Sequence, residues 1–271
     1  MFTFSMTLMI KFKNLYLKTH IKSIVRSNIL LYKIRLLFKF NSNEDRLFPP
    51  KDSKIYHLGL SLKFPSKKTK LYIDGFQRSA NTYCRQLLIR CFPDLNLAWN
   101  HFHTLAPLKL AIKHNVPIII IIRNPQGAVF SSIIRKVYGS GSKKKITIEN
   151  DSYEYFKYYN FVLNNLEKIT VLNFDDYTKN PVILTKTVSD LLNEPEPEYS
   201  LVGKISDEVL LMLRDDKREN PAMHQLNSEK KDAMKANLKS EILKNFYYSK
   251  CEKVYDSILK KINNQNNDVQ K

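Results

Sequence analysis

The chain has 271 residues, of which 43% are hydrophobic, and this favours one large α/β domain with an appendage over two small domains. Its three cysteines have no metal-ligand spacing, which argues against a zinc site and a disulfide framework and fits a reducing, cytoplasmic compartment. The formal net charge of +18 suits an anionic partner, but it does not choose between a nucleotide, an acidic glycan, a lipid headgroup and nucleic acid.

Residues 1–68 are predicted to form a basic N-terminal helical region and its connection to the core. Residues 1–70 hold fifteen Lys or Arg and three acids, and the first forty residues hold no acid. Apolar and basic residues interleave as in a basic amphipathic helix, but no apolar run approaches the roughly 18 residues of a membrane span. Such a helix either lies peripherally on an anionic membrane surface or packs on the domain.

Short β-like runs alternate with longer helical runs over residues 69–262, which predicts a three-layer, P-loop-like α/β domain with a central parallel sheet flanked by helices. The predicted strands span residues 71–73, 116–122 and 169–174. A predicted helix follows each of the first two strands, ending at residue 91 and at about residue 137 respectively. Three further helices are predicted over residues 151–168, 182–192 and 228–262. The polar residues 263–271 are predicted to be a disordered tail.

The stretch that begins at Leu71 carries the most chemical information, because a short strand leads through a loop of small and polar residues into an amphipathic helix. Backbone N–H groups at a helix N-terminus bind phosphate, and the helix dipole adds about half a positive charge there. Gly75 permits a tight turn, and Ala80 lets the backbone approach an anion closely. The loop is therefore a predicted phosphate cradle.

The loop departs from the nucleoside triphosphate pattern G-x-x-x-x-G-K-[ST]. Gly75 and Thr82 keep its frame, whereas Ala80 replaces the second glycine and Asn81 replaces the lysine. Without that lysine the γ-phosphate and its magnesium lose a main support, which counts against a kinase or ATPase. A P-loop kinase or other nucleotide-binding protein stays open as an alternative, as does a non-catalytic module that binds an anionic polymer or a membrane surface through residues 1–70.

A second phosphate-type element follows the isoleucine run 118–122. Arg123 stands where that predicted strand ends, at the carboxyl edge of the sheet, where open α/β sheets bind their ligands. Pro125 suits the first turn of the next helix. Eight residues separate Arg123 from Ser131, so Ser131 is expected about two turns into that helix and on nearly the same face as its start.

Together these residues resemble a known family. Segment 76–83 looks like the 5′-phosphosulfate loop of the sulfotransferases that use the donor PAPS (3′-phosphoadenosine-5′-phosphosulfate). Segment 122–125 with Ser131 looks like their 3′-phosphate motif, and segment 171–181 resembles a third landmark, a strand that ends in an aromatic-acidic pair before a short helix. The order and spacing of the three motifs, over residues 70–193, make the resemblance more specific than any one of them.

The resemblance implies transfer of a sulfuryl group from PAPS to a hydroxyl or amine, with PAP (3′-phosphoadenosine-5′-phosphate) as product and no metal. Arg78 is implied to stabilise the charge that builds on the leaving phosphate. The implied nucleotide-binding residues are Gln77, Arg78, Ser79, Ala80, Asn81, Thr82, Tyr83, Arg123 and Ser131.

A histidine general base is also implied between the two phosphate motifs. His101 and His103 both lie there. The distance along the chain to Arg123 suits His101 best, but strand and loop lengths vary, so His103 stays open. A neutral imidazole near pH 7 can accept the proton of the acceptor hydroxyl as its oxygen attacks sulfur.

Two departures narrow the expected subgroup. Many cytosolic members carry a glycine-rich Arg-Lys-Gly segment near the C-terminus, but the last glycine of this sequence is Gly203, and the aspartate usual after the Arg-Asn-Pro turn is Gly127. These departures point to the divergent carbohydrate-type or bacterial members. A glycan, glycolipid or small metabolite is therefore the expected acceptor, bound by the variable loops 136–150 and 194–204, and no nucleic acid is expected.

Overall fold

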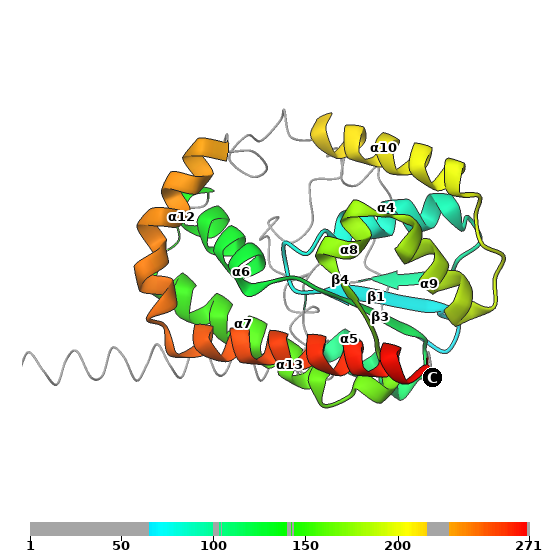
Figure 1. Ribbon diagram of the computed structural model, residues 1–271, viewed down its shortest axis with the longest axis horizontal. Coiled ribbons are helices and arrows are strands. Elements are labelled where there is room, and N and C mark those ends of the chain that lie inside the picture. Colours follow the sequence, from blue (N-terminus) through cyan, green and yellow to red (C-terminus); the bar gives the residue numbers. More distant parts are fainter. Residues whose placement is uncertain are drawn as a thin grey trace, which may run out of the picture.

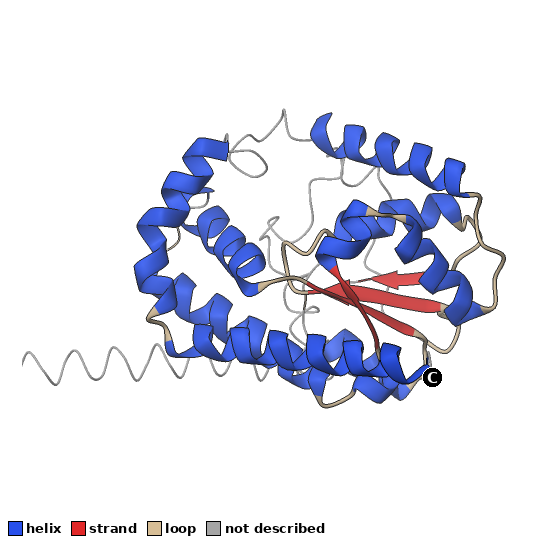
Figure 2. Ribbon diagram, in the orientation of Figure 1, coloured by secondary structure: helices blue, strands red, loops and turns tan. Residues whose placement is uncertain are grey.

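The computed structural model describes residues 65–99, 103, 105–139, 142, 144–215 and 228–269 (Figure 1). The predicted basic helix within residues 1–64 and His101 lie outside these residues. Among the described residues, four strands form one parallel sheet in the order β2-β1-β3-β4 (Figure 2). The strands are β1 Leu71–Gly75, β2 Leu97–Trp99, β3 Ile118–Ile122 and β4 Thr170–Asn173.

Helices connect the strands, and further helices follow the last strand in the sequence. The α-helices are α4 Asn81–Cys91, α5 Leu105–Lys113, α6 Pro125–Ile134, α7 Lys144–Leu163, α8 Phe174–Lys179, α9 Val182–Leu192, α10 Tyr199–Asp215, α12 Ser228–Leu243 and α13 Phe246–Val269. A π-helical turn, η1, spans Arg135–Gly139, and a 3₁₀ turn, η2, spans Leu166–Lys168. No helix in the described part of the chain is both long and apolar enough to cross a bilayer.

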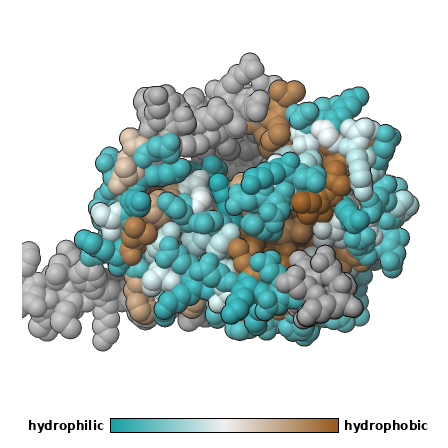
Figure 3. Space-filling view, viewed as in Figure 1, coloured by the Kyte–Doolittle hydropathy of each residue, from teal (hydrophilic) through white to brown (hydrophobic). Residues whose placement is uncertain are grey.

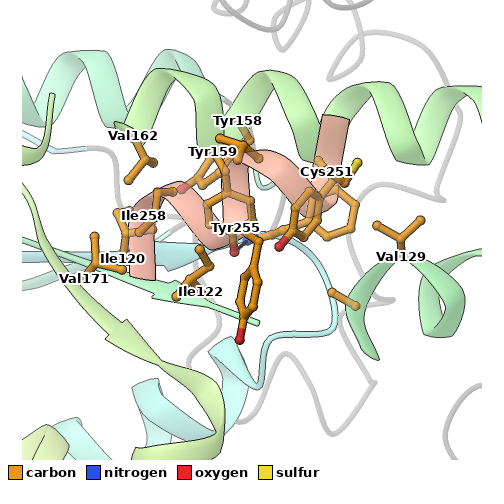
Figure 4. Packing of buried hydrophobic residues seen from close by; sticks show 14 of the residues in the cluster. Ile120, Ile122, Val129, Tyr158, Tyr159, Val162, Val171, Cys251, Tyr255 and Ile258 are labelled. Carbon is orange, nitrogen blue, oxygen red and sulfur yellow. Dashed lines mark hydrogen bonds between the residues drawn. The ribbon is translucent and has the colours of Figure 1, made fainter. Parts of the chain in front are cut away.

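Strand β3 is buried on both faces, which explains its unbroken run of isoleucines. Successive strand residues point to opposite faces, so Ile119 and Ile121 join a core with α4, α9 and α10. Ile120 and Ile122 join the other core, where Tyr255 and Ile258 of α13 pack beside α7 (Figure 4). In Figure 1, α4 and α10 lie above the sheet, and α5, α7 and α13 lie below it. The predicted three-layer, P-loop-like α/β fold is confirmed.

Several predicted boundaries were wrong. The expected single helix over 228–262 is interrupted, because the Asn245 side chain accepts hydrogen bonds from the backbone N–H groups of Tyr247 and Tyr248 and so caps α13. Residues 263–269, expected in a disordered tail, continue α13, where no glycine or proline stops the helix.

The two segments expected as acceptor loops are partly helical. Segment 136–150 contains most of η1 and the start of α7, and segment 194–204 contains the start of α10. Strand β2 and helices α5 and α10 were not predicted. The face shown in Figure 3 is mainly hydrophilic, with hydrophobic side chains in smaller groups.

The backbones of β1 and β3 approach each other closely beside the site. Gly75, the last residue of β1, pairs with Ile121. A Cβ at residue 75 would lie 2.5 Å from the Ile121 carbonyl oxygen, a backbone atom that cannot turn aside. Glycine is therefore required where β1 leads into the phosphate-type loop.

We predict that Gly75→Ala lowers the free energy of unfolding by about 1–3 kcal/mol, because the added methyl forces β1 and β3 apart. Urea denaturation of the two proteins measures the change. Gly203→Ala in α10 is the matched control: a Cβ there meets nothing within 4 Å, so helix propensity alone should stabilise the protein by about 1 kcal/mol. Equal stability of Gly75→Ala and the wild type would contradict the prediction.

Candidate active site

The loop between β1 and α4 has an unusual backbone. Arg78 and Ala80 both adopt left-handed conformations, with φ of 72° and 56°. Ala80 is the N-cap residue of α4, and its side chain supplies no hydrogen-bond acceptor for the first turn. Alternation of left-handed residues with a helix start turns backbone N–H groups toward a common point, a geometry that binds anions. Such strained residues, at about 1–3 kcal/mol each, cluster at ligand sites.

Two buried tyrosines hold the loop from behind. The Tyr159 hydroxyl, from α7, donates to the Ile121 carbonyl at 2.7 Å and accepts from the Phe76 backbone N–H at 3.1 Å. The Tyr177 hydroxyl, from α8, donates to the Ser79 carbonyl at 2.9 Å. Elements on both sides of the sheet therefore fix the loop backbone before any ligand binds.

The structure brings together the two phosphate-type motifs predicted from the sequence. The Arg78 guanidinium donates from Nε to the Ser131 hydroxyl at 3.0 Å, and Arg123 Nη1 donates to the Arg78 carbonyl at 2.5 Å. The Arg123 guanidinium also stacks 4.0 Å from the centre of the Phe174 ring, at the start of α8. Parallel strands β1 and β3 end at the same sheet edge, which explains why residues 45 and 53 positions apart in sequence meet here.

This neighbourhood is strongly positive. Burial, together with the nearby charges of Arg135 and Arg123, lowers the pKa of Arg78 to about 10. Burial also lowers the pKa of Arg123, although Asp175 at the start of α8 opposes the shift. Buried cations that repel one another destabilise the protein unless an anion compensates them. Arg135 was not singled out from the sequence, because its distance from the loop depends on the η1 turn.

The loop also has unused hydrogen-bonding capacity. Ser79 is fully buried, and its hydroxyl has no hydrogen-bond partner among the described residues. The same holds for Oδ1 of Asn81. Buried polar atoms are rarely left without a partner in folded proteins, so these two atoms mark where a polar ligand or water fits.

His103 lies at the base of this loop. Its Nδ1 is 2.9 Å from Oδ1 of Asp74 and 3.2 Å from Nδ2 of Asn81. Asp74 is 1% exposed and belongs to β1, and its other oxygen accepts from the Tyr72 hydroxyl at 2.8 Å. Of the two candidate bases, His103 is thus placed beside the loop, and His101 is outside the described residues. Asp74 was missed, although an acid inside an apolar strand is a visible signal.

The other predicted loop residues differ in placement. Gln77 and Thr82 are half-buried at the loop and in the first turn of α4. The Tyr83 side chain is buried, and its hydroxyl hydrogen-bonds Ser206 of α10 at 2.8 Å, so it belongs to the core between two helices. Its backbone N–H still lies in the first turn of α4.

Gly127, where the resembled family usually has aspartate, has a steric role. A Cβ there would lie 2.8 Å from Nε of Arg123. The Arg123 side chain therefore lies across the first turn of α6, where any side chain at residue 127 would clash with it. This position explains how the guanidinium reaches the Arg78 carbonyl.

No family model matches the sequence, and no curated protein matches it. Among solved structures, mouse sulfotransferase SULT7A1 complexed with PAP is similar at a TM-score of 0.44 and 14% identity, over 71% of this chain and 90% of that one. A similarity at this level supports no conclusion about function. The proposed function rests on the residues of this chain.

We predict that Arg78→Gln keeps or raises the melting temperature of the free protein, because it removes one of three neighbouring cations. Inorganic phosphate should stabilise the wild type in a thermal shift assay and stabilise Arg78→Gln much less. Arg90→Gln is the control, since Arg90 lies at the other end of α4 beside Glu208. Equal stabilisation of wild type and Arg78→Gln by phosphate would contradict an anion site at the loop.

Proposed function

We propose that this protein is a PAPS-dependent sulfotransferase that transfers a sulfuryl group to a hydroxyl or amine of a glycan, glycolipid or small metabolite. The main support is the meeting of the β1–α4 loop with Arg123 and Ser131 at one sheet edge, joined through Arg78. One phosphate cradle is common to many nucleotide-binding proteins. Two cationic phosphate-type sites in contact suit a nucleotide that carries phosphate at both its 5′ and 3′ positions.

The loop would hold the 5′-phosphosulfate. Its backbone N–H groups and the hydroxyls of Ser79 and Thr82 supply donors, and Arg78 supplies charge. Arg123 and Ser131 would hold the 3′-phosphate. Arg123 donates to the Arg78 carbonyl, and the Ser131 hydroxyl accepts from the Arg78 side chain. These contacts keep Arg123 and Ser131 oriented for a ligand. The orphaned Ser79 hydroxyl fits this assignment, because a phosphate oxygen would give it an acceptor.

The chemistry assigned to the chain is proton transfer and charge stabilisation. As the acceptor oxygen forms a bond to sulfur, the bond between sulfur and the 5′-phosphate oxygen breaks. His103 accepts the proton that the acceptor hydroxyl loses. Arg78 and the loop amides stabilise the negative charge that develops on the leaving phosphate, and positioning by the rigid loop lowers the entropic cost of the reaction.

Calorimetry with PAP, compared with ATP and magnesium, tests the proposal. We expect tight, metal-independent binding of PAP, weakened about 10- to 100-fold in Arg123→Ala, because hydrogen bonds to charged groups contribute about 1.5–3 kcal/mol. Arg90→Ala, an arginine outside the site, should bind PAP like the wild type. Preference for magnesium-ATP over PAP would instead favour a P-loop kinase or nucleotide hydrolase.

The choice of base is tested by two single variants. We predict that His103→Ala lowers turnover of PAPS by about 10²- to 10⁴-fold, the usual range for general base catalysis, while PAP affinity is retained. His101→Ala should lose much less. Release of PAP in the presence of a panel of glycan, phenol and amine acceptors measures both. A loss confined to His101→Ala would move the base to that residue, and full activity in both variants would remove histidine from the mechanism.

A further inference from the structure

Asp74 is a buried carboxylate in the middle of the sheet. It is 1% exposed, stands one residue before the glycine that ends β1, and pairs with Ile120 of β3. A buried carboxylate without partners costs several kcal/mol. Here both oxygens have one: Oδ2 accepts from the Tyr72 hydroxyl at 2.8 Å, and Oδ1 lies 2.9 Å from Nδ1 of His103.

These contacts determine which nitrogen of His103 carries the proton. Nδ1 also lies 3.2 Å from Nδ2 of Asn81, but that amide nitrogen has two hydrogens and donates to the carbonyls of Gly75 and Phe76. An unprotonated Nδ1 would face a carboxylate oxygen with its lone pair, which is repulsive. Protonated Nδ1 donates to Asp74 instead, and in the neutral ring Nε2 then keeps the lone pair.

We propose that Asp74 is a positioning residue that holds His103 as the Nδ1–H tautomer, so that Nε2 is the basic nitrogen, and stabilises the imidazolium formed during the reaction. The catalytic part of this proposal rests on the proposed function. The proton of the acceptor hydroxyl passes to Nε2, the acceptor oxygen keeps the electron pair with which it bonds to sulfur, and the proton on Nδ1 stays in place beside the carboxylate. Asp74 and His103 are arranged like the aspartate and histidine of a Ser-His-Asp triad, in which the acid orients the base.

The backbone at His103 supports a positioning role. His103 has a φ of 48°, in the left-handed region. Such a conformation costs of order 1–3 kcal/mol and persists where surrounding contacts fix it. The ion-pair contact to Asp74 and the contact to Asn81 are two such constraints on the ring.

Three tyrosines lie around the Asp74 carboxylate. Tyr72 extends from β1, and Tyr158 and Tyr159 approach from α7. Burial raises the pKa of Tyr158, and the charge of Asp74 raises it further; burial likewise raises the pKa of Tyr159. Tyr158 and Tyr159 therefore stay neutral around pH 7.

The tautomer can be measured without any substrate. In ¹⁵N-labelled wild-type protein, long-range ¹H–¹⁵N correlation should show His103 protonated at Nδ1 in its neutral form, with the signal assigned by its loss in His103→Ala. Asp74→Asn should shift the ring toward the Nε2–H form, because an amide N–H facing Nδ1 needs an acceptor. A wild-type ring protonated at Nε2 would overturn the proposal, whether or not any variant folds.

Kinetics test the catalytic part. We predict that Asp74→Asn lowers turnover of PAPS by about 10²- to 10⁴-fold with PAP affinity within about twofold of the wild type, the pattern of a misoriented base. In the His103→Ala background the same change should cost nothing further, because Asp74 acts through His103. Tyr72→Phe, which removes the partner of the other oxygen, should leave the tautomer unchanged and cost far less.

The outcomes separate the two proposals. A wild-type protein that neither binds PAP nor turns over PAPS rejects the proposed function, while the tautomer result stands or falls alone. A wild-type protein that turns over PAPS, together with an active Asp74→Asn or with additive losses in the double variant, rejects the positioning role and leaves the sulfotransferase assignment intact.

Discussion

The site depends on how closely two parallel strands approach at their carboxyl ends. Gly75 and Ile121 are paired, and the absence of a side chain at residue 75 lets the β3 backbone lie against the start of the loop. From that contact β1 continues into the loop and β3 continues into Arg123. The Tyr159 hydroxyl then links the two exits by bonding both the Ile121 carbonyl and the Phe76 amide. One backbone constraint thus sets the distance between both predicted phosphate sites.

Burial of two arginine charges at the site destabilises the folded protein, and the rest of the fold offsets this loss. Arg78 and Arg123 are largely removed from water, and burial lowers the pKa of each. Two left-handed residues in one short loop add backbone strain. The compensation lies in the two apolar cores, where the isoleucines of β3 are fully or almost fully buried. A trade of stability for a pre-organised, positively charged site is common in binding proteins.

Much of the fold followed from local patterns. The unbroken isoleucine run over 118–122 required a strand buried on both faces, and the 182–192 helix matched its apolar spacing. Strand β2 was missed, because three residues, Leu97–Trp99, carry too little pattern and are held by pairing with β1. Helix α10 was missed because its start was interpreted as a loop, although its buried Val202, Ile205 and Val209 have helical spacing.

The site was predictable where it depends on strand ends and unpredictable where it depends on side-chain packing. The meeting of the loop with Arg123 and Ser131 follows from two parallel strands ending together. The Asp74–His103 contact does not, because it requires the direction of one strand side chain and a left-handed residue in a connection of variable length. Spacing along the chain favoured His101 over His103, because spacing carries no information about the left-handed turn that brings His103 to Asp74.

The packing of α13 on the sheet also bears on how the protein is made. Cys251, Tyr255 and Ile258 cover the face of β3 that presents Ile120 and Ile122, yet ribosomes synthesise them more than a hundred residues later (Figure 4). A nascent chain that has completed β3 and β4 already has α5 and α7 on this face but still lacks α13, so the part of the apolar face that α13 covers stays open. Unpaired apolar sheet faces are prone to aggregation. Chaperones that bind nascent chains are accordingly expected to engage this protein until α13 emerges, and folding of its lower layer is expected to be late.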